Sequence, residues 1–304
     1  MGKSVGDVAV TYHGEKSSSF SRNFWRRLCQ DKLALIGGCI LLLFLLAGIF
    51  APLLAPHDPV LVDVKIRLQE PSLEYPLGTD NMGRCILSRL IFGARTTLTT
   101  SLLVLAGILA VGIPLGLLAG YCGGWVDNVI MRAADIVCTF PSSLLALAIV
   151  SIFGSSLWNV MLALVSLWWA PFARILRGTV MKTKEQDFVL AAQASGTSRW
   201  RIVTRHILLN SISPIVVYST LRVAAIIMHV AGFSFIGLGT QAPDADWGVM
   251  LNDARQFIST APLQMVWPGL AIMLVVFSLN MFGEGLNAAL LPSSGKKSKD
   301  WGNH

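Results

Sequence analysis

Charge is scarce in this sequence of 304 residues: only 13% of them are Asp, Glu, Lys or Arg, whereas 54% are hydrophobic. Soluble domains carry about 25% charged residues, so this balance excludes an ordinary water-soluble protein. Long uncharged runs take the place of the missing charge. Because roughly 20 apolar residues in a helix cross a bilayer core, the sequence predicts an all-α, polytopic membrane protein.

Cysteines and nucleotide-binding motifs are also scarce. The five cysteines are scattered and never in a CxxC spacing, and only Cys85 falls in an outer loop, so no intrachain disulfide is expected there. Gly2-Lys3-Ser4 lacks the upstream glycine and the preceding strand that a phosphate-binding loop needs. We therefore expect this chain to bind no cofactor and to be no enzyme itself.

Uncharged runs predict six membrane-spanning helices. The first run follows a basic stretch ending at Lys32 and has no small-residue cleavage site at its end, so we expect it to be retained. The stretch 136–173 is too long for one span and too short for two, so the turn before it is included and a break is placed near Gly154. The predicted spans are 33–56, 96–121, two within 127–173, 213–236 and 262–289.

The second span carries glycines at four-residue intervals, which predicts close approach of a neighbouring helix at Gly112, Gly116 and Gly120. Tryptophans near predicted span ends are expected to anchor at the interface; these are Trp158, Trp168, Trp169, Trp247 and Trp267. The resulting division is a tail 1–32, a first span 33–56, an outer segment 57–95, a five-helix core 96–290 with loops 185–206 and 240–261, and a tail 291–304.

Lysines and arginines in short loops decide the orientation. They are concentrated before the first span, after the fourth span and at the C-terminus, which all fall on one side of a six-span topology. We therefore predict cytoplasmic N- and C-termini and a periplasmic location for 57–95 and 240–261. Topology accounts for the net charge of +7, so no nucleic-acid partner is expected.

The loop after the fourth span is predicted to contain a polar, basic helix. Its alanine pair and Gly196 permit close approach of another protein, and Arg199, Arg201 and Arg205 lie within two helical turns, where they suit acidic partners. The alternative is a loop whose basic residues only follow the positive-inside rule and which happens to be helical. Spacing alone does not separate these two interpretations.

Through Asn210 this loop resembles the coupling-loop motif of ABC importer permeases, a Glu-Ala-Ala triplet followed by a glycine and an Ile-x-Leu-Pro ending. Ala191, Ala192, Gly196 and Leu208 match in register, whereas Leu190, His206 and Leu209 replace the glutamate, isoleucine and proline. The resemblance implies that the loop docks on an ATPase. The residues it assigns to ATPase coupling are Leu190, Ala191, Ala192, Gly196, Arg199, Arg201 and Arg205.

The resemblance extends over nearly the whole chain. Fragments of 77–95 look like the outer segment and second-span entry of the dipeptide, oligopeptide and nickel permease family, although Cys85 replaces that motif's usual aspartate. Fragments of 131–141 resemble the entry to its third span. Those of 229–270 are most similar to the nickel-transport permease subunit of enteric bacteria.

By this resemblance the chain is identified as a member of that permease family, with the six-helix fold of a type I ABC importer transmembrane domain. A location in the bacterial inner membrane is implied, with membrane lipid and a second, homologous permease subunit as neighbours. Two ABC ATPase subunits, which use ATP and Mg²⁺, and a periplasmic or surface substrate-binding protein complete the implied importer. Nickel, as ion or chelate, is the first expected cargo, and dipeptides or oligopeptides are the alternative.

Ionisable side chains in the fifth span mark a candidate translocation path. Arg222 and His229 are seven residues apart and share a helix face, with Ser219 about a turn below. Such groups usually face a bundle interior or an aqueous path. The alternatives are that Arg222 snorkels to the membrane boundary and that His229 only bonds a neighbouring helix. Imidazole suits Ni²⁺, so His229 is a candidate transient contact, while no stable metal site is expected.

The outer loops offer a docking surface for a binding protein, expected at Asp244, Asp246 and Asp253. Two other classes of function stay open. An ATP-independent transporter or channel is expected to have inverted repeats, broken helices or a ring of like charges at mid-membrane. The sequence has no two halves that resemble each other in this way. A structural anchor for a signalling complex is disfavoured only by the family-like segments.

Overall fold

The computed structural model describes residues 26–290, and this part of the chain is α-helical without a β-strand. One isolated antiparallel bridge joins Thr79 and Cys85. The predicted all-α class is thus confirmed. Residues 1–25 of the predicted N-terminal tail, and the whole predicted tail 291–304, lie outside the described residues.

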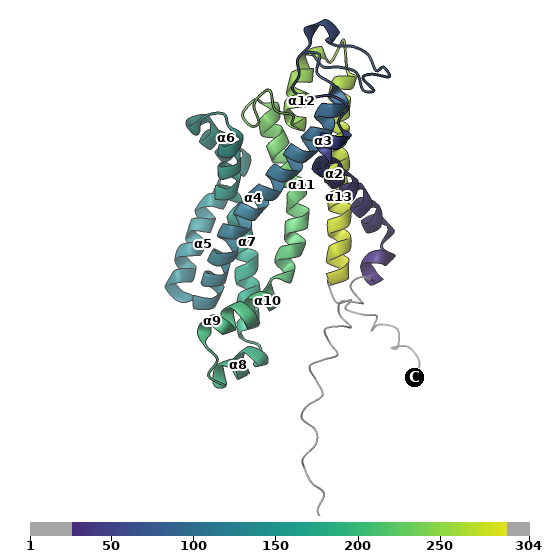
Figure 1. Cartoon of the computed structure of the whole chain (residues 1–304). Coiled ribbons are helices and arrows are strands. Elements are labelled where there is room, and N and C mark those ends of the chain that lie inside the picture. The colour runs from purple at the N-terminus through teal and green to yellow at the C-terminus, as the bar shows by residue number, and fades with distance from the viewer. Residues whose placement is uncertain (1–25, 291–304) are drawn as a thin grey trace, which may run out of the picture.

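Five of the described helices are long and apolar enough to cross a membrane. They are α2 (Lys32–Ile49), α4 (Ile86–Cys122), α7 (Leu157–Lys184), α11 (Ser213–Phe235) and α13 (Leu263–Leu290). The helices α5 (Gly124–Thr139) and α6 (Ser142–Phe153) make a sixth if they are one span, bent by 87° (Figure 1). The six-span prediction holds in that form.

The bend between α5 and α6 has a local cause at Phe140 and Pro141. Pro141 has no backbone N–H, and a residue that precedes proline is disfavoured in the α region. Phe140 accordingly adopts an extended conformation, with φ −93° and ψ 147°. The third predicted span is therefore two short helices rather than one straight helix.

Two predicted boundaries were wrong. The first helix ends at Ile49 instead of 56, and the short helix α3 (Ala51–Leu54) follows with Pro52 in its first turn. The second helix begins at Ile86 instead of 96, inside the predicted outer segment 57–95. Arginines at 89 and 95 mark that region as a loop in the sequence, but Arg89 is buried in the fold.

The glycine stripe of α4 packs directly against α7, as predicted. A methyl group added at Gly116 would lie 2.6 Å from the carbonyl oxygen of Ala173, and one added at Gly120 would lie 2.8 Å from Val180. Neither position has room for a side chain. Small residues thus allow these two long helices to approach closely.

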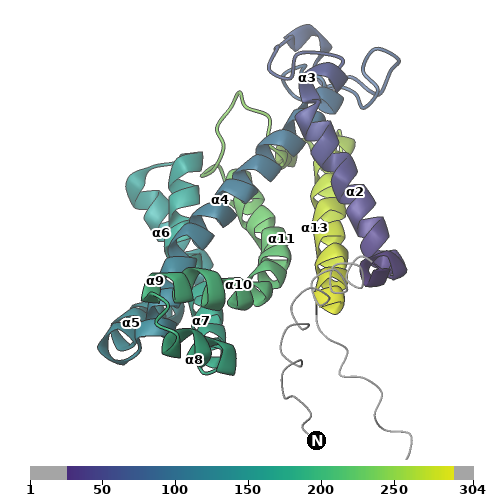
Figure 2. The ribbon, with the colours of Figure 1, turned by 60° about the horizontal axis from the view of Figure 1, so that its bottom comes forward.

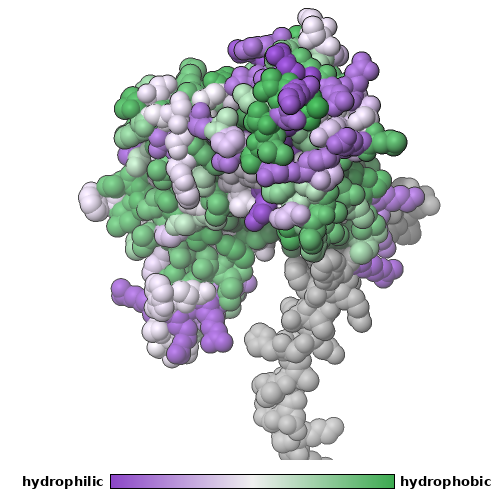
Figure 3. Space-filling model, turned by 45° about the horizontal axis from the view of Figure 1, so that its top comes forward, coloured by the Kyte–Doolittle hydropathy of each residue, from purple (hydrophilic) through white to green (hydrophobic). Residues whose placement is uncertain are grey.

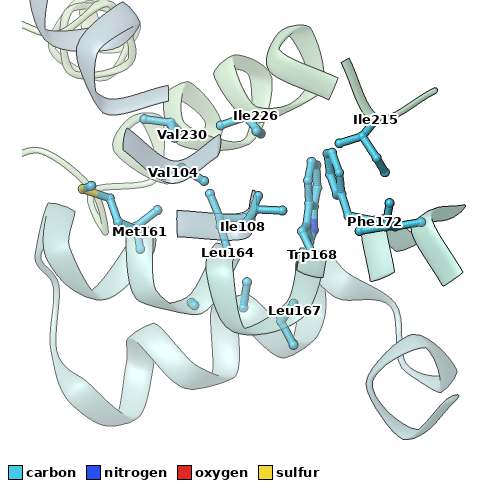
Figure 4. Close-up of a cluster of buried hydrophobic side chains, with 14 of the residues drawn as sticks. Val104, Ile108, Met161, Leu164, Leu167, Trp168, Phe172, Ile215, Ile226 and Val230 are labelled. Atoms are coloured by element: carbon cyan, nitrogen blue, oxygen red, sulfur yellow. The ribbon is translucent and has the colours of Figure 1, made fainter. Parts of the chain in front are cut away.

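The largest core cluster joins α4, α7 and α11 (Figure 4). Ile108 of α4, Leu164 and Trp168 of α7, and Ile226 of α11 are among its buried members. The other side of α11 packs on α13 through a second cluster that includes Ile227 and Val275. Helix α11 therefore connects two halves of the molecule.

These halves diverge like the arms of a V (Figure 2). One arm consists of α2 and α13, the other contains α4 to α7, and α11 lies between them. On the face seen in Figure 3, hydrophobic residues form a band across the middle, and hydrophilic residues gather toward both ends. Such a band is what a lipid-embedded bundle presents to the bilayer.

One hydrophilic end is formed by residues 57–89 and 237–264, which we name the cap. It contains the short 3-10 helices η1 (Val64–Ile66) and η3 (Arg255–Phe257), the helix α12 (Trp247–Ala254) and the first turn of α4. The opposite end carries the 185–206 segment and the start of α11 (Figure 1). The two ends therefore separate the predicted docking loops from the predicted coupling loop.

Candidate functional site

The 185–206 segment is not the single helix that the sequence predicted. It forms α8 (Asp187–Ala194), a turn, α9 (Arg199–Arg201) and the π-helix η2 (Ile202–Ile207), and α10 (Leu208–Ser211) follows. Gly196 ends α8 with φ +76°, a left-handed conformation that glycine adopts without cost. The glycine therefore separates the alanine pair from the three arginines, which lie on different short helices.

This segment has one buried and one exposed face. Val189, Ile202 and Ile207 are buried in the same cluster as Trp168 of α7. Other side chains of the segment are exposed: Leu190 of α8 is 50% and Trp200 of α9 is 77% exposed. Arg199 and Arg201 of α9 and Arg205 of η2 are exposed as well.

Trp200 was not singled out from the sequence. Its position between two arginines was the available signal, since exposed Trp and Arg are the side chains that most often anchor protein interfaces. Large apolar side chains exposed near arginines are what a soluble partner would cover.

Polar contacts fix the residues that flank the segment on either side. The hydroxyl of Ser211 donates to that of Thr183 at 3.1 Å, and Lys184 Nζ donates to the Tyr121 carbonyl oxygen at 2.8 Å. Further along α7, Arg177 donates two hydrogen bonds to the Asp127 carboxylate of α5, at 2.5 and 2.6 Å. The segment is thus tied through α7 to the centre of the bundle.

Arg222 and His229 do share a face, because both contact Trp168. The Arg222 guanidinium lies 5.7 Å from the Trp168 ring and 4.7 Å from the Tyr218 ring. The His229 ring meets Trp168 edge to face at 4.7 Å, and its Nδ1 lies 2.8 Å from the Ala225 carbonyl oxygen. Trp168 is therefore buried between helices and is not the interfacial anchor that the sequence predicted.

Ser219 lies one turn below Arg222 but does not line the cavity that Arg222 borders. It is buried, and its hydroxyl donates to the Ile215 carbonyl oxygen of its own helix at 2.7 Å. Its hydroxyl therefore bonds within α11, and a role for Ser219 in the path stays a prediction.

Two hollows border the shared face. Arg222, Trp168 and Cys138 are among the residues that line a cavity of about 200 Å³ between α5, α7 and α11. His229, with Leu144 of α6, lines a second, largely apolar hollow of about 420 Å³. Within residues 26–290 no group of three His, Cys, Asp or Glu side chains could hold a metal ion.

Asp246 cannot be part of a docking surface in this structure. It is fully buried and caps α12, where its carboxylate accepts from the backbone N–H of Gly248 at 2.9 Å and of Val249 at 3.2 Å. The Thr97 hydroxyl donates to it at 3.0 Å. Burial raises the pKa of this carboxyl, and those hydrogen bonds oppose the rise. The docking prediction was wrong here because the acid caps a helix.

Asp253 is also engaged inside the cap. It accepts from Arg84 Nη2 at 2.8 Å and from Arg89 Nη1 at 3.2 Å, and both arginines also pair with Asp80. The arginines are only 1% exposed. Asp253 thus serves an internal ion-pair network, which the sequence did not reveal because its partner Arg84 lies 169 positions away.

Asp244 is the one predicted docking acid that is exposed. Together with Asp58 and His57 it lines an open hollow of about 630 Å³ next to the start of α4. Two carboxylates around an open concave surface suit a basic group of a partner. Asp244 therefore stays a docking candidate.

Comparison with known proteins agrees with this architecture. Residues 112–295 match the family described as "Binding-protein-dependent transport system inner membrane component", and residues 19–71 match the "N-terminal TM domain of oligopeptide transport permease C". The MetNI methionine ABC transporter, in an inward-facing conformation, superposes with a TM-score of 0.54 and 16% identity, over 67% of this chain and 97% of that chain. That likeness concerns the fold.

Three relatives align over most of their length. The dipeptide permease DppC of Alkalihalophilus pseudofirmus is 44% identical over 271 residues, 89% of each chain. The nickel permease NikC of Escherichia coli K12 is 41% identical over 86% of this chain and 93% of its own. The glutathione permease GsiD of Pectobacterium atrosepticum is 41% identical over 89% of this chain and 90% of its own.

The bundle and its two hydrophilic ends define a multi-pass transport subunit. The chain belongs to the inner membrane components of binding-protein-dependent transport systems and is a permease subunit of the ABC importer class. The predicted resemblance to dipeptide, oligopeptide and nickel permeases is confirmed.

Proposed function

We propose that this chain is one of two permease subunits of an ATP-driven importer in the bacterial inner membrane, with both termini in the cytoplasm. In this proposal the 185–206 segment docks on an ATPase subunit, and the cap faces a substrate-binding protein. The observation that carries it is the exposure of Leu190, Trp200 and three arginines within one short segment at a hydrophilic end of the bundle. A partner would remove this apolar surface from water.

The packing of the segment supports a mechanical role. Val189, Ile202 and Ile207 share one continuous buried cluster with Trp168 and Val230, which lie beside the candidate path. Close-packed interiors transmit strain rather than absorb it. Closure of the ATPase subunits would therefore shift α7 and α11 together, and the two permeases would alternate between inward-facing and outward-facing states.

The cargo proposed first is a short peptide. Two of the three relatives described above carry names that specify a dipeptide or glutathione. The Arg222 guanidinium beside two aromatic rings suits a carboxylate and an apolar side chain. Nickel, as ion or chelate, is the second candidate, favoured by the NikC relative and by His229 on the same face.

The test is uptake into proteoliposomes that contain this chain, its partner permease and the ATPase subunits, with the binding protein added. We expect labelled dialanine to accumulate only with ATP, and not with a non-hydrolysable ATP analogue. Accumulation of Ni²⁺ in place of dialanine would select the second cargo. Uptake without ATP, driven by an ion gradient alone, would contradict the importer and favour a secondary transporter, while no uptake under any condition would favour an anchor.

A further inference from the structure

The guanidinium of Arg222 is a charge without a counter-charge. Among residues 26–290 no carboxylate lies within ion-pair distance of it, and its contacts are the Tyr218 and Trp168 rings. A charged group within a span usually pairs with another charge or with backbone carbonyls, because an isolated charge is costly there. Two ring faces offset part of that cost and leave the N–H donors of the guanidinium free.

The acidic groups nearest along the facing helix are already paired. Asp127 of α5 accepts two hydrogen bonds from Arg177, and Asp135 accepts one from Arg174 at 2.7 Å. Both partners come from α7, so α5 has no acid left for α11. The cavity wall that Arg222 shares with α5 and α7 therefore has a positive excess.

Arg222 also lies too deep for a lipid phosphate. It is the tenth residue of α11, about 14 Å from the start of the helix at 1.5 Å per residue. The cavity that it lines, about 200 Å³, is bordered by Phe140, Phe172 and Tyr218. A small anion with an apolar neighbour matches this combination of one cation and several rings.

We propose that the Arg222 cavity is a transient binding site for the carboxylate of the transported molecule, with Arg222 as its specificity-determining residue. The inference rests on the proposed function, because it needs cargo to pass this face. A planar guanidinium can form two parallel hydrogen bonds with one carboxylate, whereas a lysine ammonium cannot do so in that geometry. The terminal carboxylate of a short peptide is the class of ligand expected.

A native thiol reports on the cavity. Cys138 lines it together with Arg222 and is exposed. In the complete importer in nanodiscs, with the other four cysteines of this chain replaced by Ser or Ala, we would measure the labelling rate of Cys138. The probes are an anionic sulfonatoethyl and a cationic trimethylammonioethyl methanethiosulfonate of similar size.

We expect the anionic probe to react faster, and Arg222→Gln to reduce the anionic-to-cationic rate ratio by about tenfold, the effect of removing one nearby charge. Arg222→Lys should keep most of the ratio. Arg95→Gln is the matched control, because Arg95 is exposed in the first third of α4 and does not line this cavity. A ratio that Arg222→Gln leaves unchanged in the complex would overturn the proposal, since a partner subunit would then neutralise the arginine.

The chemical class of the cargo is tested by whether it protects Cys138 from labelling. Dialanine should slow the labelling of Cys138 by neutral N-ethylmaleimide, dialanine amide should not, and Arg222→Lys should weaken the protection. Equal protection by both compounds, or by neither, would overturn the carboxylate assignment. If Arg222→Gln does not assemble, the lysine variant still decides through the protection assay. ATP-dependent uptake by the wild-type importer tests the proposed function separately.

Discussion

The cap and the 185–206 segment are the two hydrophilic ends of the molecule, and they are built in opposite ways. The cap has charged residues in its interior: Arg84, Arg89 and Asp246 are buried. In the 185–206 segment, charged residues are external, and large apolar side chains such as Trp200 are exposed beside them. The buried ion pairs of the cap find their partners within this chain, whereas the segment exposes Trp200 and Leu190 without a cover among the described residues.

The difference has a physical reading. Buried ion pairs add little net stability, but they are strongly destabilising to break, so they fix one arrangement of the loops that they join. Here they join the start of α4 to α12 across the cap. Exposed apolar surface has the opposite role: burying it against a partner would lower the free energy, so it favours binding.

Removing Asp80 should damage the cap most. Asp80→Ala leaves Arg84 and Arg89 with Asp253 as their only acidic partner among residues 26–290, and breaking such a pair costs about 3–5 kcal/mol. We expect a clear loss of folded protein and a lower unfolding temperature in detergent. Asp63→Ala is the control, because Asp63 is exposed and its carboxylate accepts a hydrogen bond from the Lys65 backbone N–H without forming an ion pair with any described residue. Equal unfolding temperatures for the two variants would show that the network does not hold the cap.

Gly196→Trp should abolish coupled transport while membrane insertion and cap stability stay normal. Nothing lies within 4 Å of a side chain added at Gly196, so the indole would project into the space that a partner would fill. The positive φ adds strain of roughly 1–2 kcal/mol for most residues but less for asparagine. Gly196→Asn therefore separates strain from bulk and should retain most ATP-dependent uptake. Normal uptake by a correctly inserted Gly196→Trp protein would remove the segment from coupling.

Asp246 should give a smaller, pH-dependent effect. Since burial raises its folded-state pKa above the unfolded value of about 3.9, the folded state binds a proton more readily. Its contribution to the free energy of unfolding is therefore fully present below the unfolded pKa and decreases as pH rises through the folded pKa. Asp246→Asn should remove this trend, and Asp246→Ala should cost about 1 kcal/mol through loss of the helix cap.

Unfolding temperatures of the three proteins between pH 3 and pH 8 measure this effect. The difference between wild type and Asp246→Asn should shift against the wild type as pH rises. A shift in the opposite direction would mean that hydrogen bonding, and not burial, dominates at this carboxyl.

Asp244 should give the smallest change. Asp244→Lys should weaken docking of the binding protein at low salt, and the difference from wild type should fade above about 0.15 M salt, where exposed charges are screened over about 8 Å. Asp63→Lys is a matched reversal on another exposed part of the cap. Stimulation of the ATPase by the binding protein, followed across ionic strengths, gives the comparison. Identical curves for both variants would exclude Asp244 from the docking surface.

The sequence predicted the features that lipid dictates and missed those that depend on distant partners. Six apolar stretches are readable because every span must be long and uncharged. Asp253 looks like a free acid until the fold brings Arg84 and Arg89 to it. For the same reason the start of α4 was predicted too late. A buried, paired arginine such as Arg89 looks like an exposed loop arginine in the sequence.

Local geometry was predicted where spacing alone determines it. Seven-residue spacing correctly placed Arg222 and His229 on one face, but the ring between them, Trp168, comes from another helix. Gly196 was interpreted as a small contact residue, whereas its backbone ends a helix. The proline that bends α5 against α6 was visible in the sequence, but its 87° angle depends on tertiary packing.

Hydrogen exchange of this permease, measured with and without its ATPase subunits, tests the contrast between the two ends most directly. We expect backbone amides of 187–207 to exchange at least about tenfold more slowly when the ATPase is bound, because a covered surface opens less often. Amides of 78–89 in the cap should be unchanged, since their partners lie within this chain. Unchanged exchange in 187–207, or equal protection of both regions, would contradict the account.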